Sequence, residues 1–197
     1  MIPRVSVLVL GATICTAVAQ DWIVGFNNAN LPVTAAHPDR LVRISPGGPG
    51  LVGTNYQAVL LYGAPGSSLN PALPPARFRV STTLSPGTWQ GGDRTLTGMG
   101  NTPGTQVQLQ VAVFDINQFG TYAAAVAGGG ILGRSSLFTY TIPAPPLAPD
   151  ATDLLNFDGF AIPEPTVLAL GVLGAVVVWM ARGRVRTGSR QSRNAID

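Results

Sequence analysis

The sequence has no lysine and only one histidine, one cysteine and one glutamate among its 197 residues. Only 11% of the residues are charged. General acid–base catalysis needs such groups in pairs, placed within hydrogen-bond reach of each other or of the substrate. Because few are present, we expect a protein that is not an enzyme and that needs no cofactor and no metal.

A basic surface for nucleic acid is also missing, although the net charge is +3. Arginine supplies all the positive charge, and five of the twelve arginines lie behind residue 181. Between Gln20 and Ile162, six arginines face seven aspartates, which leaves the body of the chain with a net charge of −1. Without a basic stripe to neutralise phosphates, nucleic acid is excluded as a partner.

Glycine and proline are abundant instead, with 24 and 17 residues. Both disfavour the interior of a helix, so a body rich in turns and built from strands is expected. A hydrophobic content of 46% argues against a disordered chain. The length fits one domain with a segment at each end.

The first nineteen residues have the three parts of a secretory signal peptide. Arg4 provides the positive start, 5–14 is an apolar core, and Ala17-Val18-Ala19 matches an A-x-A cleavage site. We therefore expect export, cleavage by signal peptidase after Ala19, and a mature chain that begins at Gln20. The alternative is a buried N-terminal helix. Cys15 lies in the leader, so the mature chain would have no cysteine for a disulfide or a zinc site.

A second apolar segment lies close to the C-terminus. Residues 167–181 carry no charge, and Arg182, Arg184 and Arg186 follow them. Fifteen helical residues span about 22 Å, whereas the hydrocarbon core of a bilayer is about 30 Å thick. The helix must therefore begin near residue 166, and the long side chain of Arg182 must reach the membrane interface. We predict a transmembrane helix at about 166–181 whose arginines stop translocation and keep the tail, 187–197, in the cytoplasm. The alternative is a buried helix of a globular domain.

The triplet Pro163-Glu164-Pro165 stands directly before this helix. Each proline fixes its own φ, and Pro165 pushes Glu164 toward extended geometry. The triplet is therefore a stiff, extended peptide with one carboxylate, and it would stand at the outer surface of the membrane. An enzyme could recognise such a peptide.

Together, Pro163-Glu164-Pro165, the short apolar helix and the terminal arginines resemble the PEP-CTERM sorting signal of exported proteins in Gram-negative bacteria. The resemblance covers about 25 residues, 163–186. It implies that a membrane-embedded exosortase recognises the motif, cleaves nearby and passes the protein to the cell surface or to an exopolysaccharide matrix. The expected partners are thus the exosortase, the secretion translocon, signal peptidase, the membrane and the exopolysaccharide. The tail beyond Arg186 is longer than the family's usual arginine cluster.

Between the two ends, alternating apolar residues and turn clusters predict short strands. The clearest is 105–115, where Val107, Leu109, Val111 and Val113 face one side and three glutamines face the other. We also predict strands at 21–26, 41–44, 56–62, 77–84 and 136–142. In 77–84, Phe78, Val80, Thr82 and Leu84 are expected to point inward. Six such strands predict a mainly-β, single β-sandwich-like ectodomain at 20–142.

Two other stretches have their own patterns. Residues 121–130, TYAAAVAGGG, suggest a short helical turn that glycine ends. Residues 143–162 begin with PAPPLAP, which favours an extended spacer leading to the sorting segment at 163–186. The stretch from 56 to 145 also resembles ectodomains found on PEP-CTERM proteins.

Two motifs match a functional pattern only in part. Gly48 to Gly53 fits G-x-G-x-x-G, but it contains a proline and lacks an acidic residue about twenty positions later. Asp115 opens a sequence like a calcium loop, but Phe119 and Val126 stand where oxygen ligands are needed. A turn at the end of a strand explains the second stretch better.

We therefore expect a non-catalytic surface or matrix protein sorted by an exosortase. The main alternative is a carbohydrate-binding module that uses Trp22, Trp89 or Tyr122 as stacking platforms, although aromatic residues of this kind usually pack in a core. A third possibility is an envelope enzyme. His37 is its only histidine, and no pattern pairs it with a nucleophile, so a lone surface histidine is expected.

Overall fold

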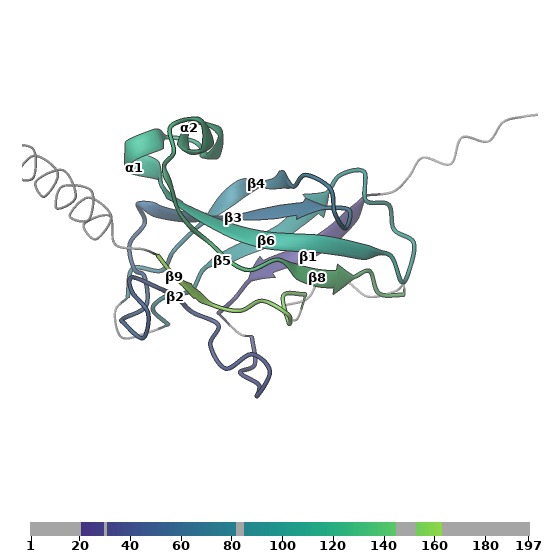
Figure 1. The fold of residues 1–197 in the computed structure, drawn as a ribbon, viewed down its shortest axis with the longest axis horizontal. Helices are drawn as coiled ribbons and strands as arrows, with labels where there is room; N and C mark the ends of the chain where they lie inside the picture. The colour runs from purple at the N-terminus through teal and green to yellow at the C-terminus, as the bar shows by residue number, and fades with distance from the viewer. Residues whose placement is uncertain (1–20, 30, 82–84, 145–152, 163–197) are drawn as a thin grey trace, which may run out of the picture.

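The computed structural model describes residues 21–29, 31–81, 85–144 and 153–162, and it is built mainly from strands (Figure 1). This part of the chain contains nine strands and two short helices. The mainly-β class predicted from the sequence is thus confirmed. The strands are β1 (Trp22–Asn27), β2 (Val42–Arg43), β3 (Tyr56–Gly63), β4 (Asn70–Arg77), β5 (Gln90–Leu96), β6 (Gln106–Asp115), β7 (Ile131–Arg134), β8 (Phe138–Thr141) and β9 (Phe160–Ala161), and the helices are α1 (Ile116–Phe119) and α2 (Tyr122–Ala127).

The largest sheet is antiparallel and has the strand order β4-β3-β6-β7. Strand β8 pairs with the first half of β6, while β7 pairs with its second half, so both lie along the same edge of β6. The prediction for β6 is confirmed, because its four inward-facing aliphatic side chains are fully buried. The buried strand predicted at 56–62 is confirmed as β3, which pairs with β6 along its whole length.

The strand predicted at 77–84 is wrong over 78–81, while Thr82 and Leu84 lie outside the described residues. The strand there ends at Arg77, and it is the preceding segment, 70–77, that forms β4 at the edge of the sheet. Pro71, Pro74 and Pro75 lie in β4 and cannot donate to a ladder, which is why they are tolerated only in an edge strand. Phe78 is buried as predicted, but Val80 is 68% exposed.

Strands β1 and β5 form a separate antiparallel pair that covers one face of the large sheet. None of the predicted strands covers β5, whose two glycines, Gly91 and Gly92, are typical of turns. The main core lies between this pair and the large sheet, and it contains Val24, Phe26, Leu96, Leu60 and Leu109 among others. Trp89 lies at its centre, fully buried, with Phe26, Phe78 and Phe157 ring centroids at 5.2, 5.6 and 5.6 Å.

The two short helices lie over one end of the opposite face of the large sheet (Figure 1). Asp115 caps α1 by accepting from the backbone N–H of Asn117, and Thr121 caps α2 by accepting from that of Ala124. The predicted turn in 121–130 is confirmed as α2, with Gly128 as its C-cap. Ala125 of α2 packs with Phe114 and Leu61 in a second, smaller core.

The domain extends further along the chain than predicted. The sequence suggested a spacer at 143–162, but 153–162 packs onto the body, and β9 pairs in parallel with β2. Leu154 and Phe157 are completely buried, and Ile162 is 6% exposed. The proline-rich start of this segment predicted an extended chain, but the apolar residues behind it are drawn into the main core.

The predicted signal peptide, the transmembrane helix at 166–181 and the tail lie outside the described residues. Within the part of the chain that the structure does describe, no helix has the length and apolar character needed to cross a membrane.

Candidate functional site

The last described segment, 153–162, is here called the C-terminal strap, and it ends one residue before Pro163. Its apolar anchors are Leu154, Phe157 and Ile162. The ring of Phe157 packs edge-on against three others, with centroid distances of 5.6 Å to Trp89, 5.9 Å to Phe138 and 6.4 Å to Phe160. Replacing a buried phenylalanine with alanine costs about 3–5 kcal/mol, so this ring alone fastens the strap strongly.

Polar groups fasten the start of the strap. The Asp153 carboxylate accepts from the backbone N–H of Gly25 at 2.7 Å and from the Tyr140 hydroxyl at 3.3 Å. That hydroxyl in turn accepts from the Trp22 indole N–H at 2.8 Å. Burial raises the pKa of Tyr140 to about 12, the Trp22 hydrogen bond opposes this shift, and the negative charge of Asp153 adds to it. The strap is thus joined to both layers of the fold.

Near its other end, the strap carries Asp158, whose carboxylate lies 2.8 Å from Nδ1 of His37. His37 is therefore not the lone surface histidine expected from the sequence. A paired histidine and aspartate are two parts of a nucleophilic triad. However, among the described residues no serine, threonine or cysteine bonds to the imidazole, and the nearby Thr34 hydroxyl accepts from the backbone N–H of His37. The pair connects the strap to the loop that contains His37.

Arg40 contributes a buried cation beside the strap, with only 3% of its surface exposed. Its guanidinium donates to the backbone carbonyls of Phe157 and Pro32. Burial lowers the pKa of Arg40, while the negative charge of Asp158 opposes that shift. One terminal nitrogen of the guanidinium is buried and has no hydrogen-bond partner among the described residues. The contact with the Phe157 carbonyl holds the strap backbone at its most deeply buried position.

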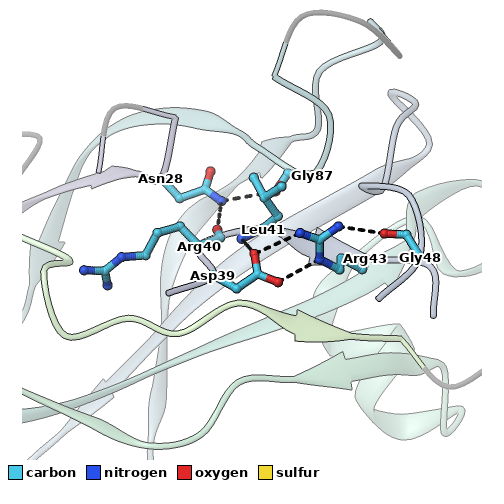
Figure 2. Close-up of polar contacts among 7 residues, drawn as sticks. All are labelled: Asn28, Asp39, Arg40, Leu41, Arg43, Gly48 and Gly87. Atoms are coloured by element: carbon cyan, nitrogen blue, oxygen red, sulfur yellow. Dashed lines mark hydrogen bonds and ion pairs between the residues drawn. The ribbon is translucent and has the colours of Figure 1, made fainter. Parts of the chain in front are cut away.

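The loop on which the strap rests is itself held by a polar network (Figure 2). Arg43 donates to both carboxylate oxygens of Asp39, at 2.7 and 3.3 Å, and to the Gly48 carbonyl at 2.7 Å. Burial raises the pKa of Asp39, but the hydrogen bonds from Arg43 and the Leu41 backbone, with the Arg43 charge, outweigh it, and the net pKa is lowered. This network fixes 39–43, the segment against which β9 pairs.

The buried amide of Asn28 holds the same loop from its other side (Figure 2). It donates to the carbonyls of Arg40 and Gly87, at 2.9 and 3.1 Å, and accepts from the Trp89 backbone N–H at 2.7 Å. A buried amide with three good bonds is fully committed to structure. Asn28 therefore positions the loop and the core tryptophan together.

A close backbone approach explains one glycine of the strap. The Gly159 N–H donates to the Asp39 carbonyl at 2.8 Å. A Cβ at this position would stand 2.2 Å from the carbonyl oxygen of Leu41 and 2.6 Å from its nitrogen. Only glycine fits there, because the backbone of Leu41 leaves no room for a side chain.

The aromatic residues proposed for carbohydrate stacking have different surroundings. Trp89 is fully buried, so the structure rules it out as an exposed platform. Trp22 is partly buried and directs its N–H to Tyr140. Tyr122, on α2, is half-buried with its ring edge-on to Phe114 at 6.1 Å. Tyr122 borders a groove on the described surface.

That groove, here called the outer groove, lies on the face of the large sheet that carries α2, and its volume is about 470 Å³. Gln110 donates to the Ser135 carbonyl at 2.9 Å, and its amide oxygen lies 3.4 Å from the Arg134 guanidinium. The Gln108 amide oxygen accepts from the Gly66 backbone at 3.1 Å. The groove is lined by both polar and apolar side chains, which include Leu61, Leu69, Gln108, Gln110, Tyr122 and Arg134.

The sequence-predicted sorting and cleavage residues lie outside the described part of the chain: Pro163, Glu164, Pro165, Arg182, Arg184, Arg186, Ala17 and Ala19. Among the residues that are described, no three His, Cys, Asp or Glu side chains cluster as a metal site would require. Comparison with protein-family models gives no match, and comparisons with curated proteins and with solved structures give none either.

Sequence reasoning missed the strap and the contacts that hold it. The pairing of His37 with Asp158 joins residues 121 positions apart, which no local pattern reveals. The spacing of Leu154 and Phe157 was the available indication, because two large apolar residues are unusual in a solvated spacer. Their proximity to the proline-rich stretch obscured it.

Proposed function

We propose that this chain is an exported, non-catalytic surface or matrix protein whose β-sandwich-like ectodomain is sorted by an exosortase. The observation that carries the proposal is the ordered series of Pro163-Glu164-Pro165, an uncharged run at 167–181, and Arg182, Arg184 and Arg186. Hydrophobicity and flanking charge are sufficient to insert such a helix. They do not require a Pro-Glu-Pro triplet, so recognition of the triplet by a second enzyme explains its presence.

The ectodomain is compatible with this proposal. Its described residues pack into the body as far as Ile162, and the triplet comes next in the sequence. Export of the chain through signal peptidase cleavage after Ala19 would place the domain outside the cytoplasm. No cysteine remains after that cleavage, so the fold would rely on packing and hydrogen bonds rather than on disulfides.

The experiment replaces Pro163, Glu164 and Pro165 with alanine in a host that encodes an exosortase. Export and membrane insertion should be unchanged, because the apolar run and the arginines are intact. The later step should fail, and an uncleaved form should accumulate in the inner membrane. Fractionation and intact mass measurement distinguish the two steps.

A matched control replaces Thr187, Gly188 and Ser189 of the tail with alanine, which changes as many residues on the other side of the helix. This control should be processed like the wild type. Equal surface delivery of the motif variant and the wild type would show that the segment is an ordinary anchor.

A carbohydrate-binding role is a second candidate, supported by the outer groove. Tyr122 offers an aromatic edge there, Gln108 and Gln110 offer amide groups, and the Arg134 guanidinium lies 3.4 Å from the Gln110 amide oxygen. Sugar sites commonly combine an aromatic surface with a few polar groups. In this role the groove would hold the protein in an exopolysaccharide matrix.

Affinity electrophoresis through gels containing the host's own exopolysaccharide tests this role. Retardation of the wild type should be lost in Gln110→Ala and kept in Gln118→Ala, which alters an exposed glutamine on α1 outside the groove. Equal retardation of both variants would remove the groove from consideration.

A further inference from the structure

We propose that a groove beside the edge strand β4 binds a small amphipathic carboxylate, a molecule with a flat apolar body and one carboxylate group. This groove is here called the proline groove, and its volume is about 450 Å³, within the range of about 300–1,000 Å³ that is typical of small-molecule sites. The inference is independent of sorting, and it concerns a different groove from the one considered for carbohydrate. The apolar residues that line the proline groove include Pro71, Leu73, Pro75, Phe114, Ile116 and Tyr122.

The apolar part of the groove is built from stiff side chains. β4 contributes Pro71, Leu73 and Pro75, while α1 contributes Ile116 and α2 contributes Tyr122. Leu73 is 61% exposed, so the fold leaves a large apolar side chain open to solvent at this position. Proline has no side-chain freedom to lose on binding, and tyrosine has only two torsions. A ligand that packs against these rings therefore costs little side-chain entropy.

Gln57 presents a buried polar group to the same groove. Only 5% of the residue is exposed, and it lines the groove from β3. Its side-chain amide forms no hydrogen bond within the part of the chain that the structure describes. The large majority of buried polar side-chain atoms have a partner, because a buried amide without one destabilises the fold. The amide is thus available to a ligand in the groove.

Arg77 supplies a positive charge beside this amide. It stands directly opposite Gln57 in the antiparallel pairing of β3 with β4, and Phe114 stands opposite Gln57 in the pairing with β6. Opposite residues share one face of a sheet, with Cβ atoms about 4.5–5.5 Å apart. Arg77 is exposed and forms no ion pair or hydrogen bond among the described residues. It is the only charged residue among those described that line the groove.

This arrangement favours one negative charge on an apolar body. A guanidinium binds a carboxylate through two parallel hydrogen bonds, and the Gln57 amide N–H can donate to the same group. Apart from Gln57, Arg77 and the hydroxyls of Thr121 and Tyr122, the described side chains that line the groove are apolar. A sugar would leave many of its own hydroxyls unpaired there, at a cost in free energy. The groove therefore matches a small organic acid better than a sugar.

The first measurement is calorimetric titration of 2-naphthoate into the full-length protein, held in nanodiscs of zwitterionic lipid, with empty nanodiscs as the blank. The neutral probe 2-naphthylmethanol has the same rings without the charge. We expect 2-naphthoate to bind at least about tenfold more tightly, because charge-assisted hydrogen bonds form with the carboxylate alone. Absence of 2-naphthoate binding, or equal affinity for the two probes, would overturn the inference. Tighter binding of 2-naphthyl phosphate than of 2-naphthoate would overturn the assignment to carboxylates.

Charge variants test the role of Arg77. Arg77→Gln should weaken 2-naphthoate binding at least about tenfold and leave 2-naphthylmethanol binding unchanged. Arg79→Gln is the matched control, because Arg79 lies two residues further along the chain and does not line the groove. This control should bind both probes like the wild type. Equal effects of the two arginine variants on 2-naphthoate would show that the charge acts from a distance and not in the groove.

A second pair of variants tests the location. Ala123 and Ala124 are both exposed on α2, but only Ala123 lines the groove. Ala123→Trp should therefore fill the groove and abolish binding of both naphthyl probes, whereas Ala124→Trp should leave binding intact. Unchanged binding in Ala123→Trp would place the probes elsewhere and overturn the inference.

Gln57→Leu separates binding from folding. Replacing an unpartnered buried amide with an apolar side chain of similar size is nearly neutral or stabilising. The urea midpoint should therefore stay the same or rise, while 2-naphthoate binding weakens at least about threefold. A lower midpoint with unchanged 2-naphthoate affinity would show that the amide serves the fold alone, and the inference would fail.

Discussion

Replacing Phe157 with alanine should destabilise the domain strongly, although the residue lies only six positions before the sorting triplet. The side chain has no exposed surface and packs against the rings of Trp89, Phe138 and Phe160. Removing a buried phenylalanine ring leaves a cavity and costs about 3–5 kcal/mol. A domain of this size has about 5–15 kcal/mol of total stability, so the change removes a large fraction of it.

Urea denaturation, monitored by tryptophan fluorescence, measures this loss of stability, because Trp89 lies in contact with Phe157. The thermal midpoint should also fall by roughly 10 °C, from about 2–4 °C per kcal/mol for a domain of this length. Leu155→Ala is the matched control, since Leu155 belongs to the same segment but is 41% exposed, and it should change stability by less than about 1 kcal/mol. If Phe157→Ala is no more destabilising than this control, 153–162 is a spacer after all.

Three other predictions concern the strap contacts and the leader. Gly159→Ala places a Cβ 2.2 Å from the Leu41 carbonyl oxygen, so the free energy of unfolding should fall by about 1–3 kcal/mol or more, and an unchanged urea midpoint would contradict the close approach. Between pH 10 and about 12 the folded chain keeps a Tyr140 proton that the unfolded chain releases, so the free energy of unfolding should fall with rising pH by about 2–3 kcal/mol. Urea titrations at pH 9 and 11.5 should show this loss in the wild type and a smaller one in Tyr140→Phe. Edman sequencing of the mature protein should give Gln20 first, and a chain that starts at Met1 would refute cleavage of the leader.

The central strands were predictable because both are long and dominated by one pattern. β6 alternates glutamine with aliphatic residues, and β3 is a continuous apolar run, so periodicity identified each. The sequence could not show that the far end of β6 is buried on both faces. Phe114 and Ala112 point toward α2, and that packing depends on the helix folding back over the sheet.

The edge strands were less predictable, because proline and glycine are ordinarily evidence against a strand. β4 contains three prolines and β5 two glycines, yet both form by pairing on one side with a partner strand. Pairing energy from a neighbour overrides the local propensity in such strands. The strand forms at 70–77 for the same reason: pairing of this segment with β3 outweighs its three prolines.

The candidate site was predictable only where it is local. The sorting triplet and its flanking segments can be read directly from the sequence, whereas the strap depends on contacts between distant residues. Asp153 meets Gly25 across 128 positions, and Phe157 meets Arg40 across 117. Such pairings arise from the three-dimensional fold, so the composition of 143–162 predicted only a spacer.

The most direct test of sorting compares the mass of the full protein in two otherwise identical hosts, one with an exosortase and one in which its gene is deleted. The account predicts, in the first host, a surface-delivered chain that begins at Gln20 and lacks Arg182, Arg184 and Arg186. In the second host it predicts a membrane-bound chain that still carries these three arginines. Identical masses and identical locations in the two hosts would contradict it.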